Sequence, residues 1–149
     1  MDKPHKIPIS TLIVIHTNAR VLLIERADFT GFWQSVTGSQ EPGESLVQTA
    51  TREVLEETGI DAEQHGGVDN WRLCNLYEIF RQWRHRYPPG TTHNMEHVFG
   101  LRVPVDVSVR VAPAEHTGYC WLAPDAAAAR CFSWSNREAI ERLSRSSRS

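Results

Sequence analysis

Cysteine is scarce in this chain, and long apolar runs and basic blocks are missing from it. The 149 residues include three cysteines, which are widely separated and show no C-x-x-C spacing. This number and spacing argue against a disulfide framework and a structural zinc site, so we expect buried, reduced thiols. No apolar run approaches the length needed to cross a bilayer, and the first ten residues lack the apolar segment of a signal peptide. The sequence therefore predicts a cytoplasmic protein.

Charge of neither sign dominates. Sixteen basic and eighteen acidic residues give a net charge of -2, and no block of basic residues is present. This balance argues against a nucleic-acid polymer or a membrane surface as partner. A composition of 40% apolar and 23% charged residues, without internal repeats or long linkers, predicts one domain over residues 1–149. Residues 144–149 are expected to form a frayed tail.

Apolar runs and turn residues alternate in a way that predicts an α/β fold. The predicted strands are 9–16, 21–26, 32–36, 71–80, 96–103 and 119–122, and the predicted helices are 46–58, 124–130 and 135–143. The strand at 71–80 is predicted to continue through 87, which would form a long basic hairpin with 96–103. Strands on both sides of a central helix fit a mixed sheet that is covered on both faces.

The stretch from Gly38 to Ile60 combines a glycine-containing loop with a well-delimited helix. Pro42 and Gly43 suit the central positions of a type II turn. Ser45 and Gln48 form a capping box at the start of the helix, and Gly59 is suited to end it. The predicted apolar stripe of this helix consists of Leu46, Val47, Ala50 and Val54.

Three glutamates gather near the end of the same helix. Glu53, Glu56 and Glu57 occupy an arc of roughly 100° beside the apolar stripe. Like charges at this spacing cost a few tenths of a kcal/mol per pair, and acids near a helix C-terminus oppose its dipole. A bound Mg²⁺ would reverse the balance, and Mg²⁺ commonly bridges carboxylates to substrate phosphates. The alternative is an ordinary solvated acidic face.

Longer spacings in this stretch carry a family resemblance. Gly38, five residues, Glu44, seven residues and the run from Arg52 to Ile60 resemble the signature of the Nudix hydrolases at every fixed position. The resemblance implies an α/β/α sandwich with a mixed sheet and metal-dependent hydrolysis of a diphosphate linkage. Residues 32–39, 84–90 and 134–137 further resemble the bacterial subfamily that hydrolyses dihydroneopterin triphosphate. Ser39, which stands where many members have a second glycine, matches this subfamily.

The resemblance also implies a metal site. Its principal ligands to Mg²⁺, or to Mn²⁺ as a substitute, would be Glu53 and Glu57, with Glu56 assisting and the carbonyl of Gly38 nearby. Glu115 would be a further ligand or the base that orients water. Its position in a loop after a proline, taken alone, predicts only a solvent-exposed acid.

Two residues beside these ligands have more than one reading. Arg52 is implied to clamp the catalytic glutamates, while its spacing to Glu56 also suits an ordinary ion pair. Glu44 either completes the metal shell or is an acid favoured at a helix N-terminus.

Further positions match substrate contacts of the subfamily. They are Lys6, Arg26, Thr37, Tyr77, Glu78, Ile79, Phe80 and Ser133. Tyr77 and Phe80 are suited to stack on a ring, and packing in the core is the alternative for both. Arg81, Arg84 and Arg86 add candidate cations for a triphosphate, although a solvated strand edge also explains them.

The implied reaction is hydrolysis of dihydroneopterin triphosphate to its monophosphate and pyrophosphate in folate synthesis, with some activity on dATP. Three alternatives stay open: hydrolysis of non-standard nucleotides, of ADP-ribose or of dinucleoside polyphosphates. A non-catalytic nucleotide-binding module on the same fold is a further alternative. In every case the expected partner is a small phosphorylated molecule, and the protein is expected to be a monomer or a homodimer.

Overall fold

A seven-stranded mixed sheet forms the centre of the protein in the computed structural model, which describes residues 4–148 and the side chains of residues 4–143. Its path is β3-β2-β1-β6-β5, with β4 added to β1 and β7 added to β2. The strands are β1 (Ile9–His16), β2 (Val21–Arg26), β3 (Trp33–Gln34), β4 (Val36–Ser39), β5 (Asp69–Glu78), β6 (His93–Arg102) and β7 (His116–Leu122). The helices are α1 (Leu46–Thr58), α2 (Pro124–Arg130) and α3 (Trp134–Arg148), with the 3₁₀ helices η1 (Ala62–His65) and η2 (Arg81–Arg86).

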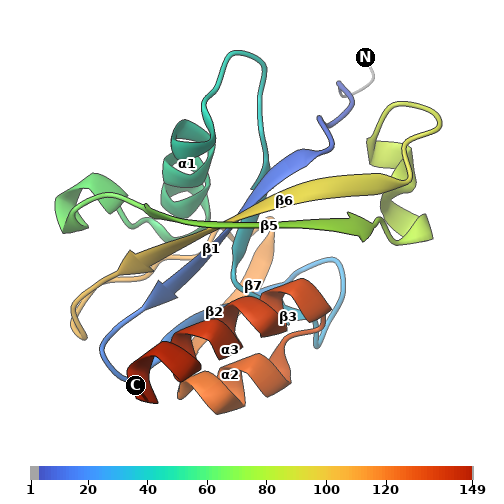
Figure 1. The fold of residues 1–149 in the computed structure, drawn as a ribbon. Coiled ribbons are helices and arrows are strands. Elements are labelled where there is room, and N and C mark those ends of the chain that lie inside the picture. The colour runs from blue at the N-terminus through green and yellow to red at the C-terminus, as the bar shows by residue number, and fades with distance from the viewer. Residues whose placement is uncertain (1–3, 149) are drawn as a thin grey trace.

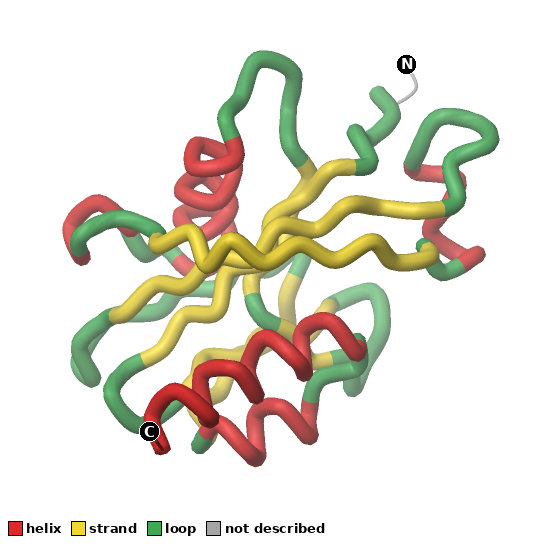
Figure 2. The backbone as a smooth tube through the Cα atoms, viewed as in Figure 1, coloured by secondary structure: helices red, strands yellow, loops and turns green. Residues whose placement is uncertain are grey.

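Strand β1 lies in the middle of the sheet. One edge pairs with β6 in parallel along the whole strand. The other edge is shared, since β4 pairs with residues 10–13 while β2 meets β1 only at the turn between His16 and Val21. Strand β2 pairs with β7 over its whole length, from Val21 to Arg26. The strands therefore diverge around β4, and the loop after β4 leads from the sheet into α1 (Figure 2). Gly38 of β4 lies against Glu53 of this helix.

Helices cover both faces of the sheet. Helix α1 packs on one face, and α2 with α3 packs on the other (Figure 1). Because strand side chains alternate between faces, β1 serves both cores. Ile13 and Ile15 join Ala50 and Val54 of α1, while Leu12 and Val14 join Ile140 of α3. The predicted α/β/α sandwich with a mixed sheet is confirmed.

The predicted strand continuation from 81 to 87 is wrong, and so is the long basic hairpin. Strand β5 ends at Glu78, and residues 81–86 form η2 instead. The last backbone bond between the two strands runs from Ile79 N to Thr92 O, after which Arg84 Nε donates to Ile79 O at 2.9 Å. Trp83 then packs against aromatic rings from other loops. These contacts favour a compact turn over further strand pairing.

Three smaller predictions also need correction. Val47 was expected in the apolar stripe of α1 but is 51% exposed, because the other stripe residues already fill the contact with the sheet. Of the three cysteines only Cys131 is buried, while Cys74 on the edge strand β5 is exposed. Helix α3 extends to Arg148, beyond the predicted end at Leu143, since no glycine or proline interrupts it. The expected fraying of residues 144–149 stays a prediction, and Ser149 lies outside the described residues.

No helix among the described residues is long and apolar enough to cross a membrane.

Candidate active site

Helix α1 is fixed at both of its ends. The Ser45 hydroxyl accepts from Gln48 N at 3.1 Å, and Ser45 N donates to the Gln48 side chain at 2.8 Å. Gly59 ends the helix with φ of 74°, in the left-handed region that favours glycine. Ahead of the helix, Gly43 has φ of 82°, and Glu44 N donates to Glu41 O as the predicted turn requires. The axial rotation of α1 is thereby set, and with it the direction of its glutamates.

Arg52 joins the loop before α1 to the helix glutamates. Its Nε and Nη2 donate to the two oxygens of Glu44 at 2.6 and 3.0 Å, which is a bidentate contact. Its Nη1 donates to Glu53 at 2.7 Å and to Glu56 at 3.3 Å, and Nη2 also reaches the carbonyl of Ser39. The hydrogen bonds from Arg52 hold the pKa of Glu44 at about 2. Glu44 therefore orients Arg52, and Arg52 orients Glu53.

Glu53 lies directly against the backbone of Gly38. A Cβ added at Gly38 would collide with the carboxyl end of Glu53 at a distance that real Cβ atoms do not adopt. Position 38 therefore accepts only glycine as long as Glu53 keeps this conformation. The close approach also brings the Glu53 carboxylate beside the β4 backbone, as the predicted role of the Gly38 carbonyl requires.

Glu57 is the most deeply buried acid of the site. It is 3% exposed, and its Oε1 lies 3.3 Å from Nε2 of His116 on β7. Ligand atoms of Glu57, His116 and the exposed Glu115 lie within 4.8 Å of one another. Burial, together with the negative charge of Glu53, raises the pKa of Glu57 well above its usual value. Burial also raises the pKa of Glu53, although Arg52 opposes the shift.

These residues fit a divalent cation. Glu57 Oε2 is buried and has no hydrogen-bond partner among the described residues. The carboxylates of Glu53 and Glu57 lie within hydrogen-bonding range of each other, which is unfavourable when both are ionised. Hard oxygen donors of this kind suit Mg²⁺. Glu56 is 56% exposed at its side chain and paired with Arg52, so it lies at the rim of the cluster.

Basic side chains approach the acids from two other segments. Lys6 N donates to Arg86 O at 2.8 Å, which docks the segment before β1 on the end of η2. Desolvation and the charge of Arg86 lower the pKa of Lys6, while the charges of Glu53 and Glu115 oppose this. Arg26 lies 4.5 Å above the Trp83 ring and forms a bidentate pair with Asp28. Arg86 also contacts Asp28, at 3.3 Å.

Lys6, Arg26 and Arg86 thus form a basic group beside the glutamates. The other two predicted arginines do not join it. Arg84 pairs with the exposed Glu78, and Arg81 is exposed.

Five aromatic rings gather next to this basic group. Phe29 and Phe32 come from the loop after β2, Phe80 and Trp83 from the start of η2, and Phe132 from the segment before α3. Adjacent ring centroids lie 4.8 to 6.1 Å apart. Phe80 remains 43% exposed, so it is not a core residue. An apolar ring in a ligand would find a stacking surface here.

The remaining predicted substrate residues do not join the glutamate cluster, and two of them face the α3 side of the sheet. Tyr77 lies on the α3 side of the sheet, where its hydroxyl accepts from Asn94 at 3.1 Å. Ile79 is buried, and Glu78 pairs with Arg84 at 2.6 Å. Ser133 accepts from Asn136 N at the start of α3. Thr37 pairs with Leu12 and therefore also faces the α3 side.

Sequence reasoning missed His116 and Trp83. His116 follows Glu115 in a turn-rich segment, and nothing in that segment distinguishes it from a surface histidine. Trp83 was assigned to the predicted continuation of the strand 71–80 through residue 87. Its ring contacts Phe29 and Phe132, which lie about 50 residues before and after it in the chain. A single sequence does not indicate such long-range contacts.

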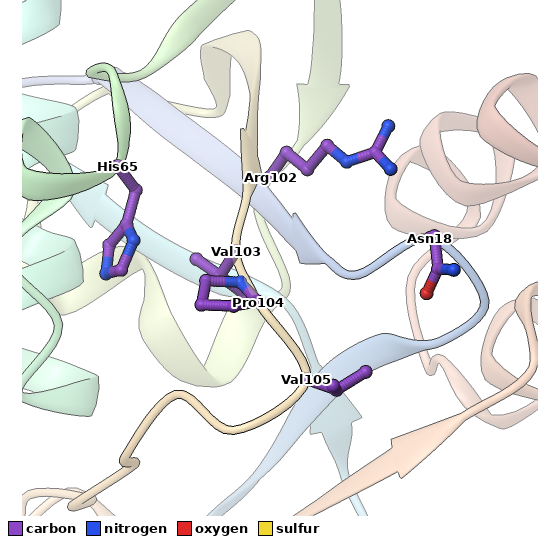
Figure 3. A pocket seen from close by; sticks show the side chains of 6 residues that line it. All are labelled: Asn18, His65, Arg102, Val103, Pro104 and Val105. Atoms are coloured by element: carbon purple, nitrogen blue, oxygen red, sulfur yellow. The ribbon is translucent and has the colours of Figure 1, made fainter.

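A separate open cleft of about 440 Å³ lies at the opposite end of β1, where His16 pairs with Arg102. Asn18 and Arg102 line it on one side of the segment 103–105, and His65 lies on the other (Figure 3). It contains no carboxylate and is not part of the glutamate cluster.

Comparison with known proteins agrees with this geometry. The NUDIX domain model matches residues 6–143. The chain belongs to the Nudix family. This Nudix chain is 48% identical over 146 residues to the dihydroneopterin triphosphate diphosphatase of Escherichia coli K12, covering 95% of both proteins. It is 36% identical to the Haemophilus influenzae protein of the same name, covering 89% of this chain and 85% of the relative.

The solved structure of the E. coli dihydroneopterin triphosphate pyrophosphohydrolase superposes on this Nudix chain with a TM-score of 0.88. The two are 44% identical in that comparison, which covers 95% of this chain and 97% of the other. The Nudix resemblance of the sequence is thereby confirmed.

Proposed function

We propose that this Nudix protein is a divalent-metal-dependent pyrophosphohydrolase that converts dihydroneopterin triphosphate to dihydroneopterin monophosphate and pyrophosphate, a step of folate synthesis. The observation that carries the proposal is the 48% identity to a dihydroneopterin triphosphate diphosphatase over 95% of both proteins. The glutamate cluster supports it, because Glu53 and Glu57 are in place and Glu115 lies beside Glu57. Residues 1–149 would then form one Nudix domain.

In this proposal Glu53, Glu57 and the Gly38 carbonyl hold the cation, Mg²⁺ or Mn²⁺, with Glu56 at the rim. When bound, the cation supplies charge neutralisation for the phosphate oxygens and Lewis acidity for the displacement at phosphorus. Arg52 keeps Glu53 in position through its contacts with Glu44 and Ser39.

Glu115 is suited to act as base because it is exposed, adjacent to Glu57 and mounted on a fixed loop. Ala27 N donates to the Glu115 carbonyl at 2.9 Å, which anchors this loop to the end of β2. Glu115 would take a proton from the attacking water as it lines up with the phosphorus atom and the departing pyrophosphate.

The basic group would bind the rest of the triphosphate. The three cations of this group are Lys6, Arg26 and Arg86. They lie near Glu53 and Glu115 of the glutamate cluster. Charge-assisted hydrogen bonds to phosphate oxygens would orient the chain of phosphates for in-line attack. Substrate-contact roles for Thr37, Ser133 and residues 77–80 belong to the same proposal.

A substrate panel with Mg²⁺ tests the proposal. It contains dihydroneopterin triphosphate, dATP, 8-oxo-dGTP, ADP-ribose and a dinucleoside polyphosphate, each scored for pyrophosphate against inorganic phosphate. We expect pyrophosphate release with the highest kcat/KM for dihydroneopterin triphosphate, and loss of turnover in Glu53→Gln and Glu57→Gln. A preference for a non-pterin substrate would refute the pterin assignment, and unchanged turnover in both variants would refute the metal site.

We further propose that the protein acts in the cytoplasm, where an exposed thiol such as Cys74 stays reduced. A monomer or a homodimer is expected.

A further inference from the structure

A second buried carboxylate lies on the sheet face opposite α1, outside the glutamate cluster. Glu96 of β6 is 3% exposed, with Ser10 of β1 and Asn75 of β5 as its register partners. The Ser135 hydroxyl hydrogen-bonds to the carboxyl group, while Oε1 has no partner among the described residues. Burial raises the pKa of Glu96 to about 7. An unpaired buried acceptor is destabilising, so stability alone does not favour a glutamate here.

Two further unpaired polar atoms share this face. Asn94 is fully buried, and its Nδ2 donates to Ser10 at 2.7 Å and to Tyr77 at 3.1 Å, which leaves Oδ1 as a free acceptor. Asn94 is two residues from Glu96 and so points to the same face. Asn75, directly opposite Glu96, leaves its Nδ2 donor unpaired. The face therefore presents two acceptors and one donor without partners in the described part of the chain.

Contacts connect this polar group to the predicted substrate residues. Tyr77 is bonded to Asn94, and Ser133 Oγ lies 3.5 Å from Ser135 Oγ, which bonds Glu96. Thr37 faces the same side through its pairing with Leu12, two residues from Ser10. Predicted substrate positions from three separate segments thus converge on the face that carries Glu96.

We propose that Glu96 and Asn94 recognise the 2-amino-4-oxo edge of the substrate ring, and that Asn75 donates to its carbonyl oxygen. Such an edge carries N–H donors on two neighbouring nitrogens and one carbonyl acceptor, which matches two acceptors and one donor. A 6-aminopurine presents an amino group beside an unprotonated nitrogen and satisfies fewer of these atoms. Sites built to hydrogen-bond a substrate group discriminate strongly against analogues that lack it. This inference rests on the proposed function. Glu96, Asn94 and Asn75 would determine which ring system of the substrate is accepted.

The variant Glu96→Gln tests the inference, with Glu63→Gln as its control. Glutamine keeps the volume but removes the charge and one acceptor. Glu63 is exposed and remote from the site, so its variant controls for the loss of one carboxylate. Each protein is assayed with dihydroneopterin triphosphate and with dATP. Glu96→Gln should lower kcat/KM for the pterin substrate by roughly 10- to 100-fold, chiefly through KM, since hydrogen bonds to charged groups are this strong. Hydrolysis of dATP should change by less than about 3-fold, and Glu63→Gln should match the wild type.

A wild-type measurement covers the case in which Glu96→Gln fails to fold. dGTP and dITP differ only in the 2-amino group, and we expect kcat/KM to favour dGTP by about 10-fold or more. Equal rates for this pair, or equal losses for both substrates in folded Glu96→Gln, would overturn the assignment while leaving the hydrolase proposal intact. If the wild-type protein hydrolyses neither pterin nor purine triphosphates, the proposed function itself fails.

Discussion

Replacing Gly38 by alanine should disable catalysis while leaving the fold intact. The added Cβ would collide with the Glu53 carboxyl end, because real Cβ atoms essentially never lie within 3.0 Å of such neighbours. The colliding atoms belong to a side chain and not to the backbone, so the carboxylate can retreat, and we estimate a displacement of roughly 1 Å. Misplacement of a catalytic group by this distance costs about 100-fold in rate, or about 2.7 kcal/mol in the activation barrier.

Steady-state kinetics measures the loss of catalysis in Gly38→Ala, and thermal unfolding measures any loss of stability. We expect kcat to fall about 100-fold in Gly38→Ala, with a change of less than about 1 kcal/mol in the free energy of unfolding. Gly118→Ala is the matched control, because a Cβ there meets nothing within 4 Å. In a Glu53→Ala background the Gly38 substitution should have little further effect, since the collision is gone. Wild-type kcat in Gly38→Ala, or a full additional loss in that background, would refute the reasoning.

Three further predictions concern other parts of the molecule. Arg52→Lys cannot form the bidentate contact with Glu44, so kcat should fall about 10- to 100-fold while Arg20→Lys has no effect; equal kcat values in the two variants would contradict this. The pKa of Glu96 rises from 4.5 to about 7 on folding. The ionised carboxylate therefore lowers the free energy of unfolding fully above pH 7, and this destabilisation is absent below pH 4.5. Denaturant unfolding should therefore find Glu96→Gln more stable than wild type by about 3 kcal/mol at pH 8 and equal to it near pH 4.5; a pH-independent difference would contradict the burial argument. Trp83→Leu removes the ring under Arg26 and should raise KM several-fold with little change in kcat, which the same kinetic assay checks.

Local sequence signals predicted the elements that local interactions stabilise. The limits of β1, β2, α1 and α2 agree with the structure, because β-branched runs, a capping box, a C-terminal glycine and an N-terminal proline determine them within a few residues. The segment 81–86 was predicted wrongly because its conformation depends on Phe29 and Phe132, which are distant in the chain.

The residues of the candidate site also fall into those that the sequence predicted and those that only the structure revealed. The glutamates of α1 follow from helical spacing, and Gly38 and Arg52 follow from the family signature. His116 joins Glu57 only because β7 pairs with β2, and that register is a property of the assembled sheet. Glu96 likewise resembles an ordinary polar residue of a strand until the helix α3 covers it. His116 and Glu96 are recognised by the burial of their polar side chains, which the residue type alone does not indicate.

The limits of α1 also bear on which insertions and deletions the chain can tolerate. Ser45 and Gly59 fix the two ends, so one residue inserted between Glu53 and Glu57 would turn the second carboxylate by about 100° and shift it by about 1.5 Å along the axis. The segment 104–115 contains no helix or strand and connects β6 to β7. Within that connection Val107, Val109 and Val111 pack on the α1 core, whereas residues 104–106 are exposed. Changes of chain length among related sequences should therefore gather at 104–106 and be absent from residues 46–58.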